Sequence, residues 1–479
     1  MRRYLRHNSI ALIGQLAGVV QGIVLVPLMV GGVGVATYGT WVLLNSVLGF
    51  LFGISSLGVG YKKDRGLPSQ SAPADRRRLF YPQLLFQLGM LGVMVLPVWV
   101  VARVLPTGVS DTFSPLLSGL YLFGLAAFAQ TNSYLRYTGR IFACTVHSTL
   151  QSSGQVVAIV ALASTGRLSI NGLLAVQTAV LMTAALPVAV RIGWEIGGPI
   201  VRPTVAALAE DIRIGFPLTV SYMVEFVLAI SDRYILALFL PRAFVGAYSA
   251  AYTVGSLPLL LPRAAGMVVP QMLMQAVDAG RTGAARALAR LTYRLFMLVA
   301  IPFCAGCVVL GRDVLRLYAG AEVARLASAV VPIVAAGIFL YGTSMLVAQV
   351  LFVQARTRTM LAASGTAAGA NVALNVGLLA WLPTLVVPAV VTLVSYATML
   401  WMMVRRRSGW QAEVAPALLV RVAAAAGIMA VAIALTGPSS GWIGLLLRVA
   451  LGIVVYAGAL AVVGVPRLPD WRDLRRELA

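Results

Sequence analysis

Fourteen apolar stretches follow one another along the chain, and each is long enough to cross a bilayer as a helix. A spanning helix needs about 20 mostly apolar residues. The stretches are residues 9–31, 37–60, 79–102, 115–135, 141–164, 170–190, 215–240, 245–272, 295–311, 328–351, 361–381, 384–404, 417–436 and 442–465. Hydrophobic residues make up 60% of the 479 and charged residues only 11%, too few to cover a water-soluble surface. We therefore predict an all-α polytopic membrane protein with about 14 transmembrane helices.

The basic residues gather in short clusters between these stretches. When successive stretches cross the membrane in opposite directions, 28 of the 37 Lys and Arg residues fall on one side, six on the other and three within helices. Cytoplasmic loops carry such an excess, so we predict that both termini are cytoplasmic. This distribution accounts for the net charge of +22. We expect no nucleic-acid partner, because no basic patch with interleaved aromatic residues occurs.

Charged side chains inside the predicted helices are the candidates for a functional site. A charge at bilayer depth costs several kcal/mol, so it usually faces a partner or a water-filled cavity. At a rise of about 1.5 Å per residue, Glu225 and Arg263 differ by only about 4–5 Å in depth on two adjacent helices, and could pair. The same segment carries Asp232 and Arg233.

Two interpretations of these charges remain open. In the first, they neutralise one another while Arg233 extends outward. Arg448, close to the outer end of its predicted helix, is separately expected to extend to the membrane surface. In the second, Arg263 and Arg233 attract an anionic substrate, and Glu225 or Asp232 carries a proton or a cation during the transport cycle.

A weak internal repeat suggests how the helices are grouped. Residues 35–40 (VATYGT) resemble residues 245–250 (VGAYSA) at an offset of 210, which spans six helices and aligns Gln15 with Glu225. Chance similarity remains an alternative for so short a match. Parallel repeats place a transporter's site at their interface. We predict two six-helix bundles in a pseudo-twofold parallel repeat plus two C-terminal helices, with boundaries at 1–205, 206–407 and 408–479, and a separate surface helix over 204–214.

This layout is similar to that of a known family. The 14 helices, the SLGVG sequence at 56–60, and Asp232 followed by GAYSAA at 246–251 resemble polysaccharide transporters of the multidrug/oligosaccharidyl-lipid/polysaccharide superfamily, in particular the oligosaccharide flippase group. The resemblance implies a V-shaped pair of bundles around a cationic cavity. It also implies that undecaprenyl diphosphate-linked repeat units of an O-antigen or exopolysaccharide are flipped across a bacterial cytoplasmic (inner) membrane.

A diphosphate would be bound by arginine, whose planar fork contacts two oxygens at once. We expect substrate contacts at Arg263, Arg233, Arg136, Arg140, Gln15 and Tyr248, and coupling to a proton or sodium ion at Glu225 and Asp232. The expected partners are the lipid-linked oligosaccharide, membrane lipids, and a polysaccharide polymerase with its chain-length machinery. We expect no metal and no other cofactor.

Other functions are less compatible with the sequence. The only histidines are His7 and His147, no nucleophile–His constellation occurs, and the Cys304–Cys307 pair lies in an apolar stretch where helix packing explains it. We therefore predict that the chain is not an enzyme. A cell-wall precursor flippase or a drug exporter of the same superfamily remains an alternative. A membrane glycosyltransferase, polymerase or ligase is a second, which the short outer loops disfavour.

Overall fold

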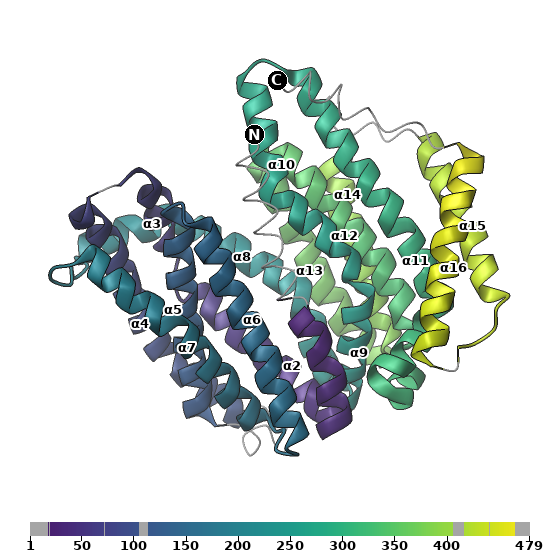
Figure 1. Ribbon diagram of the computed structural model, residues 1–479, viewed down its shortest axis with the longest axis horizontal. Helices are drawn as coiled ribbons and strands as arrows, with labels where there is room; N and C mark the ends of the chain where they lie inside the picture. Colours follow the sequence, from purple (N-terminus) through teal and green to yellow (C-terminus); the bar gives the residue numbers. More distant parts are fainter. Residues whose placement is uncertain are drawn as a thin grey trace. The chain divides into compact units, whose positions relative to one another are not determined.

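The computed structural model describes Gly18 and residues 20–70, 72–104, 114–405, 416–439 and 441–464 (Figure 1). Within these ranges all regular structure is helical, which confirms the all-α prediction. The chain divides into two compact units, unit 1 (Met1–Val227) and unit 2 (Leu228–Ala479). Their boundary falls inside one long helix, α8. The predicted three-part division of the chain stays a prediction.

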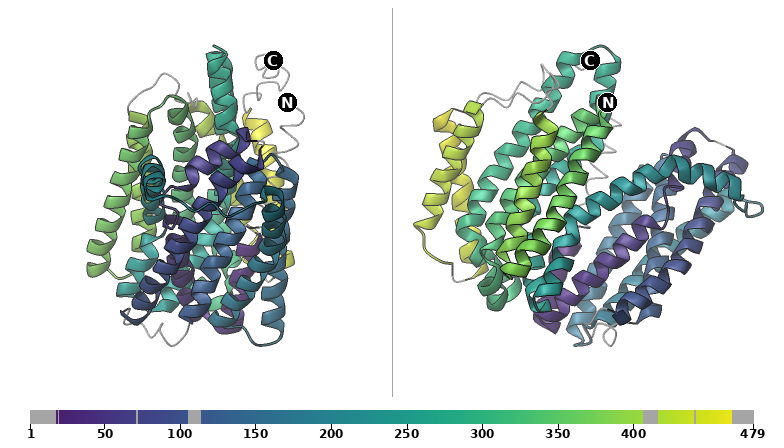
Figure 2. Two further views of the ribbon diagram at one scale, coloured as in Figure 1. Left: turned by 90° about the vertical axis from the view of Figure 1, so that its left-hand side faces the viewer. Right: turned by 180° about the vertical axis from the view of Figure 1, so that it is seen from behind.

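Unit 1 is a bundle of antiparallel helices, shown from two further sides in Figure 2. Its elements are an apolar helix at Val20–Val33, α2 (Val35–Ile54), α3 (Gly60–Gly66), η1 (Leu67–Ser69), α4 (Pro73–Val104), α5 (Pro115–Tyr137), α6 (Ile141–Ser164), α7 (Ile170–Ile196) and the first part of α8 (Val205–Phe239). Ser114 and Ser169 cap α5 and α7, because each side-chain oxygen accepts a hydrogen bond from the first turn. Helix α5 packs mainly against α7.

Unit 2 holds the rest of α8 and the helices that follow it. These are α9 (Arg242–Gly255), η2 (Leu257–Leu259), α10 (Leu260–Asp278), α11 (Thr282–Ala327), α12 (Val330–Val353), α13 (Thr357–Trp381), α14 (Val386–Arg405), α15 (Pro416–Ala434) and α16 (Trp442–Val463). Helix α12 lies at the centre and packs against α9, α10, α11 and α14, whereas α15 and α16 pack on α11. Helix α11 is broken at Gly320, where φ is +90°.

Nine helices of the described residues are long and apolar enough to cross a membrane, and a bent pair, α9 with the start of α10, makes up to ten. The pair bends by 50° around Pro258, so the predicted helix over 245–272 is interrupted. The predicted spans at 115–135, 141–164 and 361–381 are helices too (α5, α6 and α13), but they carry more polar residues. Some of the polar residues of α5 and α13 belong to the sites described below.

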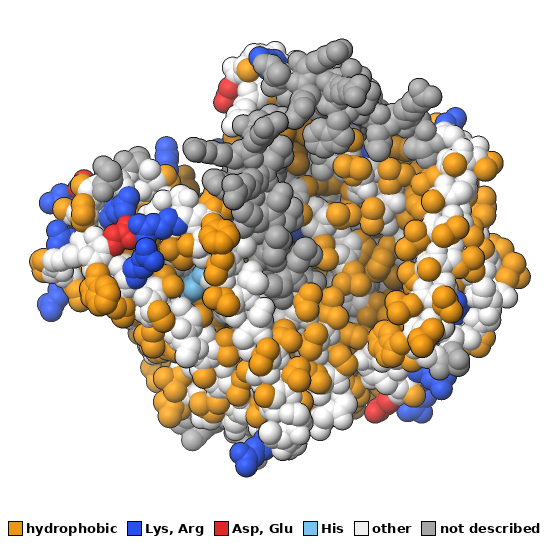
Figure 3. Space-filling model, viewed as in Figure 1, with side chains coloured by type: hydrophobic (Ala, Val, Ile, Leu, Met, Phe, Trp, Pro, Cys, Tyr) orange, Lys and Arg blue, Asp and Glu red, His pale blue; other side chains and the backbone are white. Residues whose placement is uncertain are grey.

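Two details differ from the sequence prediction. The expected separate surface helix over 204–214 is wrong, because α8 continues through Gly215 and Pro217 without a break. The first part of the predicted span 9–31 lies outside the described residues, and its second half is observed as the apolar helix Val20–Val33. On the face shown in Figure 3, hydrophobic side chains cover the middle of the helices and Lys and Arg gather near their ends, as expected for a membrane-embedded chain.

Candidate functional site

The chain turns sharply between α2 and α3, and this elbow shapes a polar cavity in unit 1. Leu57 and Gly58 both have positive φ, at 42° and 81°. At Gly58 the backbone touches that of Gly215 in α8 so closely that a Cβ atom would lie 2.2 Å from the Gly215 carbonyl. Only glycine tolerates both conditions. The elbow directs the short helix α3 back toward α4 and α5, with which it packs.

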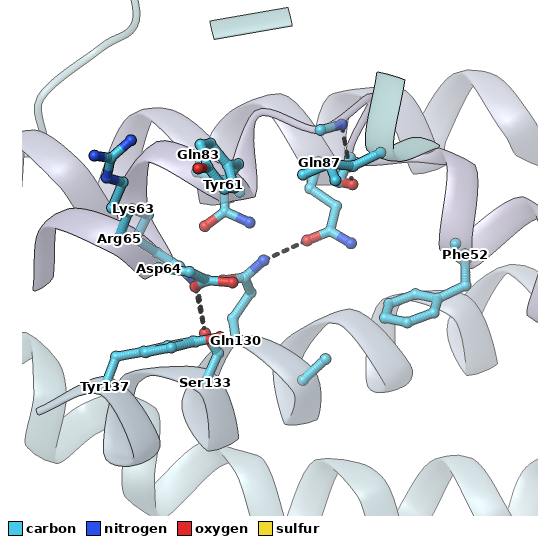
Figure 4. A pocket seen from close by; sticks show the side chains of 16 residues that line it. Phe52, Tyr61, Lys63, Asp64, Arg65, Gln83, Gln87, Gln130, Ser133 and Tyr137 are labelled. Atoms are coloured by element: carbon cyan, nitrogen blue, oxygen red, sulfur yellow. Dashed lines mark hydrogen bonds and ion pairs between the residues drawn. The ribbon is translucent and has the colours of Figure 1, made fainter. Parts of the chain in front are cut away.

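A cavity of about 530 Å³ lies beside this elbow, within unit 1 (Figure 4). Side chains from α2, α3, α4, α5 and α8 line it. Those that carry polar groups are Ser56, Tyr61, Lys63, Asp64, Arg65, Gln83, Gln87, Gln130, Ser133 and Tyr137. The labelled side chains in Figure 4 surround an open space and approach it from opposite helices. An opening of this size and polarity, among helices that face lipid, suits a polar solute.

Lys63 is the buried cation of this cavity, with only 2% of its surface exposed. Its Nζ donates hydrogen bonds to Gln130 Oε1 at 2.7 Å and Ser133 Oγ at 2.8 Å, and lies 3.3 Å from Asp64 Oδ1. These three partners use all three donors of the ammonium group. Burial lowers the pKa of Lys63, and the neighbouring Asp64 carboxylate opposes that shift.

A row of amide side chains extends the network from Lys63 into the bundle. Gln130 donates to Gln87, and Gln87 Nε2 donates to Ser55 Oγ at 3.1 Å. The Oε1 atom of Gln83 is buried and has no hydrogen-bond partner among the described residues. A buried polar atom of this kind calls for a partner such as water or a ligand group. The cavity therefore offers amides, hydroxyls and one buried cation, Lys63, to a ligand rich in oxygen atoms.

Unit 2 contains a second buried polar centre, around Asp232 on α8. Its Oδ2 accepts a hydrogen bond of 2.6 Å from the Tyr248 hydroxyl. Its Oδ1 accepts from the Arg233 backbone N–H at 2.8 Å and from the Arg233 guanidinium at 3.2 Å. That guanidinium lies 4.4 Å from the ring centre of Tyr252, a cation–π contact. Both oxygens of Asp232 therefore have donors in this conformation.

Amide and hydroxyl groups continue this centre into α13 and α14. Ser231 donates to Asn371 Oδ1 at 3.1 Å, and Asn371 Nδ2 donates to Thr392 and Ser395 at 3.3 Å each. Asn375 donates to Asn371, while its own buried Oδ1 has no partner among the described residues. These polar groups lie on a face of α13 that is buried inside unit 2.

The structure places the predicted site residues in three different settings. Asp232, Arg233 and Tyr248 lie together in unit 2, and the expected outward extension of Arg233 is wrong because it is 91% buried against Asp232 and Tyr252. Glu225 is exposed on the unit 1 part of α8, and Arg263 is exposed on α10 of unit 2. Their pairing, and a cavity between two bundles, stay predictions.

The cationic candidates of unit 1 lie at the ends of helices. Arg136 is exposed in the last turn of α5. Arg140 precedes α6 and makes a two-pronged ion pair with Glu195 on α7, at 2.6 and 2.8 Å. Arg76 and Tyr134 donate to the same carboxylate. Glu195 on α7 thus joins α4, α5 and the start of α6. A role of Arg140 in substrate binding stays a prediction, as it does for Arg136.

Other predicted residues fall elsewhere. Gln15 lies outside the described residues. The expectation that Arg448 extends to the surface is wrong: it is buried on α16, donates to Asp313 on α11, and contacts Thr436. Cys304 and Cys307 are free thiols on α11.

Lys63 and the amides beside it are the residues that the sequence analysis missed. By sequence, Lys63 belongs to the basic loop over 62–78, one of the loops that supply the 28 basic residues of the predicted cytoplasmic side. One signal was available, because Lys62 and Lys63 are the only lysines in a chain with 37 basic residues. Lysine is a compact, strongly hydrated cation that shifts its pKa when buried, unlike arginine. The adjacent Lys62 is exposed and pairs with Asp211, so the two lysines have different settings.

Comparison with known proteins supports the fold. The MatE family model matches residues 217–376, which run from α8 to α13. A structure of the lipid II flippase MurJ in an inward closed conformation has a TM-score of 0.70 at 13% identity, covering 97% of this chain and 99% of that chain. An inward-facing multidrug MATE transporter of the MOP superfamily gives 0.64 at 13%, covering 85% and 96%. A mutant of the Vibrio cholerae MATE transporter VcmN gives 0.58 at 13%, covering 85% and 98%.

No curated protein matches the chain by sequence. At identities this low, the structural likeness concerns the fold, which the chain shares with the MurJ structure and with the MATE transporter structures. The MatE match adds a sequence-level link over α8 to α13. The expected likeness of fold is confirmed, and the assignment to the oligosaccharide flippase group stays a prediction.

Proposed function

We propose that the chain is a flippase that moves a polyprenyl (undecaprenyl) diphosphate-linked oligosaccharide across the cytoplasmic membrane by alternating access. The observation that carries the proposal is the cavity of unit 1, where the buried Lys63 ammonium lies among amides and hydroxyls. Sugar hydroxyls and phosphate oxygens are the groups that such a lining binds, because it supplies both donors and acceptors. A largely apolar drug would leave these buried polar groups unpaired.

The length of the fold supports a lipid flippase over a drug exporter. The MATE structures cover about 85% of the chain, whereas the MurJ structure covers 97%. The roughly 15% of the chain that the MATE structures leave uncovered is similar in length to the segment 408–479, which contains α15 and α16. An architecture that extends through two further helices is therefore shared with a protein described as a lipid II flippase.

In the proposed cycle, the polyprenyl tail stays in the membrane while the diphosphate and the sugars pass through a polar cavity of the protein. Lys63 attracts the diphosphate, and the amides of unit 1 contact the sugars. A contribution of Arg263, which belongs to unit 2, stays a prediction. Asp232 takes up a coupling proton or sodium ion only after Arg233 or Tyr248 releases one of its oxygens. Release by Tyr248, on α9, would separate α9 from α8 at this point, whereas Arg233 lies on α8 itself and its side chain can leave without such a shift. In this proposal both termini are cytoplasmic. A polysaccharide polymerase with its chain-length machinery remains an expected partner.

The decisive experiment measures transport directly. Purified protein in liposomes is given fluorescent undecaprenyl diphosphate-linked oligosaccharide, lipid II, or a cationic drug, and appearance on the opposite side is followed. We expect the oligosaccharide to be flipped and the drug not to be. Flipping of lipid II alone supports the cell-wall precursor alternative, for which the MurJ likeness is the specific observation. In cells, loss of the gene followed by glycan analysis identifies the surface polymer that disappears.

A further inference from the structure

A second, smaller cavity lies on the other side of Lys63 and Gln83 in unit 1, with a volume of about 220 Å³. It is bounded by α3, the start of α4 and the segment 201–211 that leads into α8. The charged and hydroxyl groups in its lining are Lys62, Lys63, Arg78, Arg202, Thr204 and Asp211. Lys63 and Gln83 line both cavities and so form the wall between them.

The charges of this second cavity are unbalanced. Four of its side chains are cationic and one is anionic. Lys62 pairs with Asp211 at 3.0 Å, a contact that raises the pKa of Lys62, and Lys63 pairs with Asp64. Arg78 and Arg202 are exposed, and no ion pair joins either of them to a carboxylate of the described residues. Two guanidinium groups from different segments thus face one cavity without a counter-ion.

The backbone adds to the attraction for an anion. Helix α8, 35 residues long, begins at Val205, directly after this cavity's Pro203 and Thr204. Thr204 Oγ1 already accepts a hydrogen bond from the Ala207 N–H, and the other N–H groups of the first turn have no partner within the helix. The positive end of the helix dipole is therefore directed at the same space as the two arginines.

We propose that this second cavity is a binding site for a phosphate ester, with Arg78 and Arg202 as its principal ligands. A planar guanidinium group can bind two phosphate oxygens at once, so arginine suits a phosphate better than an uncharged sugar. Its volume is several times the roughly 30 Å³ that one water occupies in the liquid, enough for a phosphate or diphosphate group. The phosphate is supplied either by an anionic phospholipid headgroup or by a soluble diphosphate.

The test uses the full-length chain and two probes. In detergent, thermal unfolding is measured against inorganic pyrophosphate; in nanodiscs, native mass spectrometry counts phosphatidylglycerol retained relative to phosphatidylcholine. We expect at least one probe to bind wild type at least tenfold more tightly than Arg78→Gln/Arg202→Gln. The matched control is Arg167→Gln, an exposed arginine in the turn between α6 and α7, which should bind like wild type.

The two arms distinguish the sources. Loss of pyrophosphate binding alone identifies a soluble diphosphate, and loss of phosphatidylglycerol retention alone identifies a lipid headgroup. Equal binding of both probes by wild type and the double variant overturns the site. Because both arginines are exposed, the variant's unfolding temperature without ligand should match that of wild type. This result is independent of transport: a chain that binds the probe but flips no lipid retains the site and loses the flippase function.

Discussion

The Tyr248 hydroxyl donates a hydrogen bond of 2.6 Å to Asp232 Oδ2 and thereby joins α9 to α8 inside unit 2. The other carboxylate oxygen, Oδ1, accepts hydrogen bonds from the backbone N–H and the guanidinium of Arg233. Both oxygens of Asp232 are therefore hydrogen-bonded. An ion that binds Asp232 would have to displace one of these donors. If Asp232 is the coupling group, as proposed above, the Tyr248 hydroxyl competes with the coupling ion for Oδ2.

Replacing Tyr248 by Phe removes this donor and frees Oδ2. We expect the apparent affinity for the coupling ion to rise about tenfold, the equivalent of one hydrogen bond of about 1.4 kcal/mol. Transport rate in liposomes, measured against pH and against sodium concentration, gives the affinity. Tyr252→Phe is the control, because that hydroxyl contacts Tyr396 rather than Asp232. Identical ion dependence in Tyr248→Phe and wild type would exclude Asp232 as the coupling group.

Replacing Asp232 by Asn leaves the buried Arg233 guanidinium without its counter-charge. Removing one partner of a buried ion pair costs about 3–5 kcal/mol. We expect the unfolding temperature of the detergent-solubilised protein to fall clearly in Asp232→Asn. The double variant Asp232→Asn/Arg233→Gln should recover part of that loss, because no uncompensated charge remains. If the double variant is instead clearly less stable than Asp232→Asn, the two substitutions act independently and the pairing is contradicted.

The adjacent lysines provide a matched pair for transport. Lys63→Met removes the buried cation of the cavity and leaves Gln130, Ser133 and Asp64 without their shared donor. We expect it to abolish flipping of the oligosaccharide. Lys62→Met removes an exposed ion pair to Asp211, which is worth about 0–1 kcal/mol, and should leave transport near the wild-type rate. Flipping by Lys63→Met at the wild-type rate would remove this cavity from the substrate path.

The lowered pKa of Lys63 makes stability depend on pH. In the range between its folded pKa and the ordinary value of 10.5, the unfolded chain binds more protons at this position than the folded chain. Stability therefore rises with pH across that range. We expect wild type to gain stability relative to Lys63→Met as the pH is raised toward 10.5. Chemical unfolding in detergent at several pH values measures the difference, and parallel curves for the two proteins contradict it.

The helices could be predicted from the sequence because a bilayer leaves few alternatives. Backbone groups in lipid must bond within a helix, so apolar stretches of sufficient length mark most of the observed helices. Asp232 and Arg233 were found for the same reason, since a charge is conspicuous inside an apolar stretch. The 50° bend between α9 and α10 and the continuity of α8 through Pro217 were not predictable, because a proline marks a permissible kink without fixing its angle.

The cavity of unit 1 was hidden from sequence reasoning for physical reasons. Lys63 lies in a basic segment whose charge is already explained by membrane topology, and only the elbow at Gly58 turns it inward. Gln87 and Gln130 carry no charge, and they meet across 43 residues of sequence. The partner of Arg448, Asp313, lies 135 residues away. Such contacts depend on which helices become neighbours, which neither hydropathy nor charge reveals.

The elbow itself can be tested with two glycines that share a backbone conformation. Gly58 and Gly166 have φ values of 81° and 66°. A Cβ at Gly58 would lie 2.2 Å from the Gly215 carbonyl, whereas one at Gly166 would have nothing within 4 Å. Gly166→Ala should therefore cost only the left-handed strain, about 1–2 kcal/mol.

Gly58→Ala adds a backbone clash that no side-chain rotation relieves, and overpacking alone costs about 1–3 kcal/mol or more. We expect Gly58→Ala to lower the unfolding temperature well beyond Gly166→Ala and to expose Lys63 to amine-reactive labelling, because α3 is pushed away from α8. Equal stability of the two variants, with Lys63 still protected, would mean that Gly58 does not position α3. The cavity would then have to be formed by another contact.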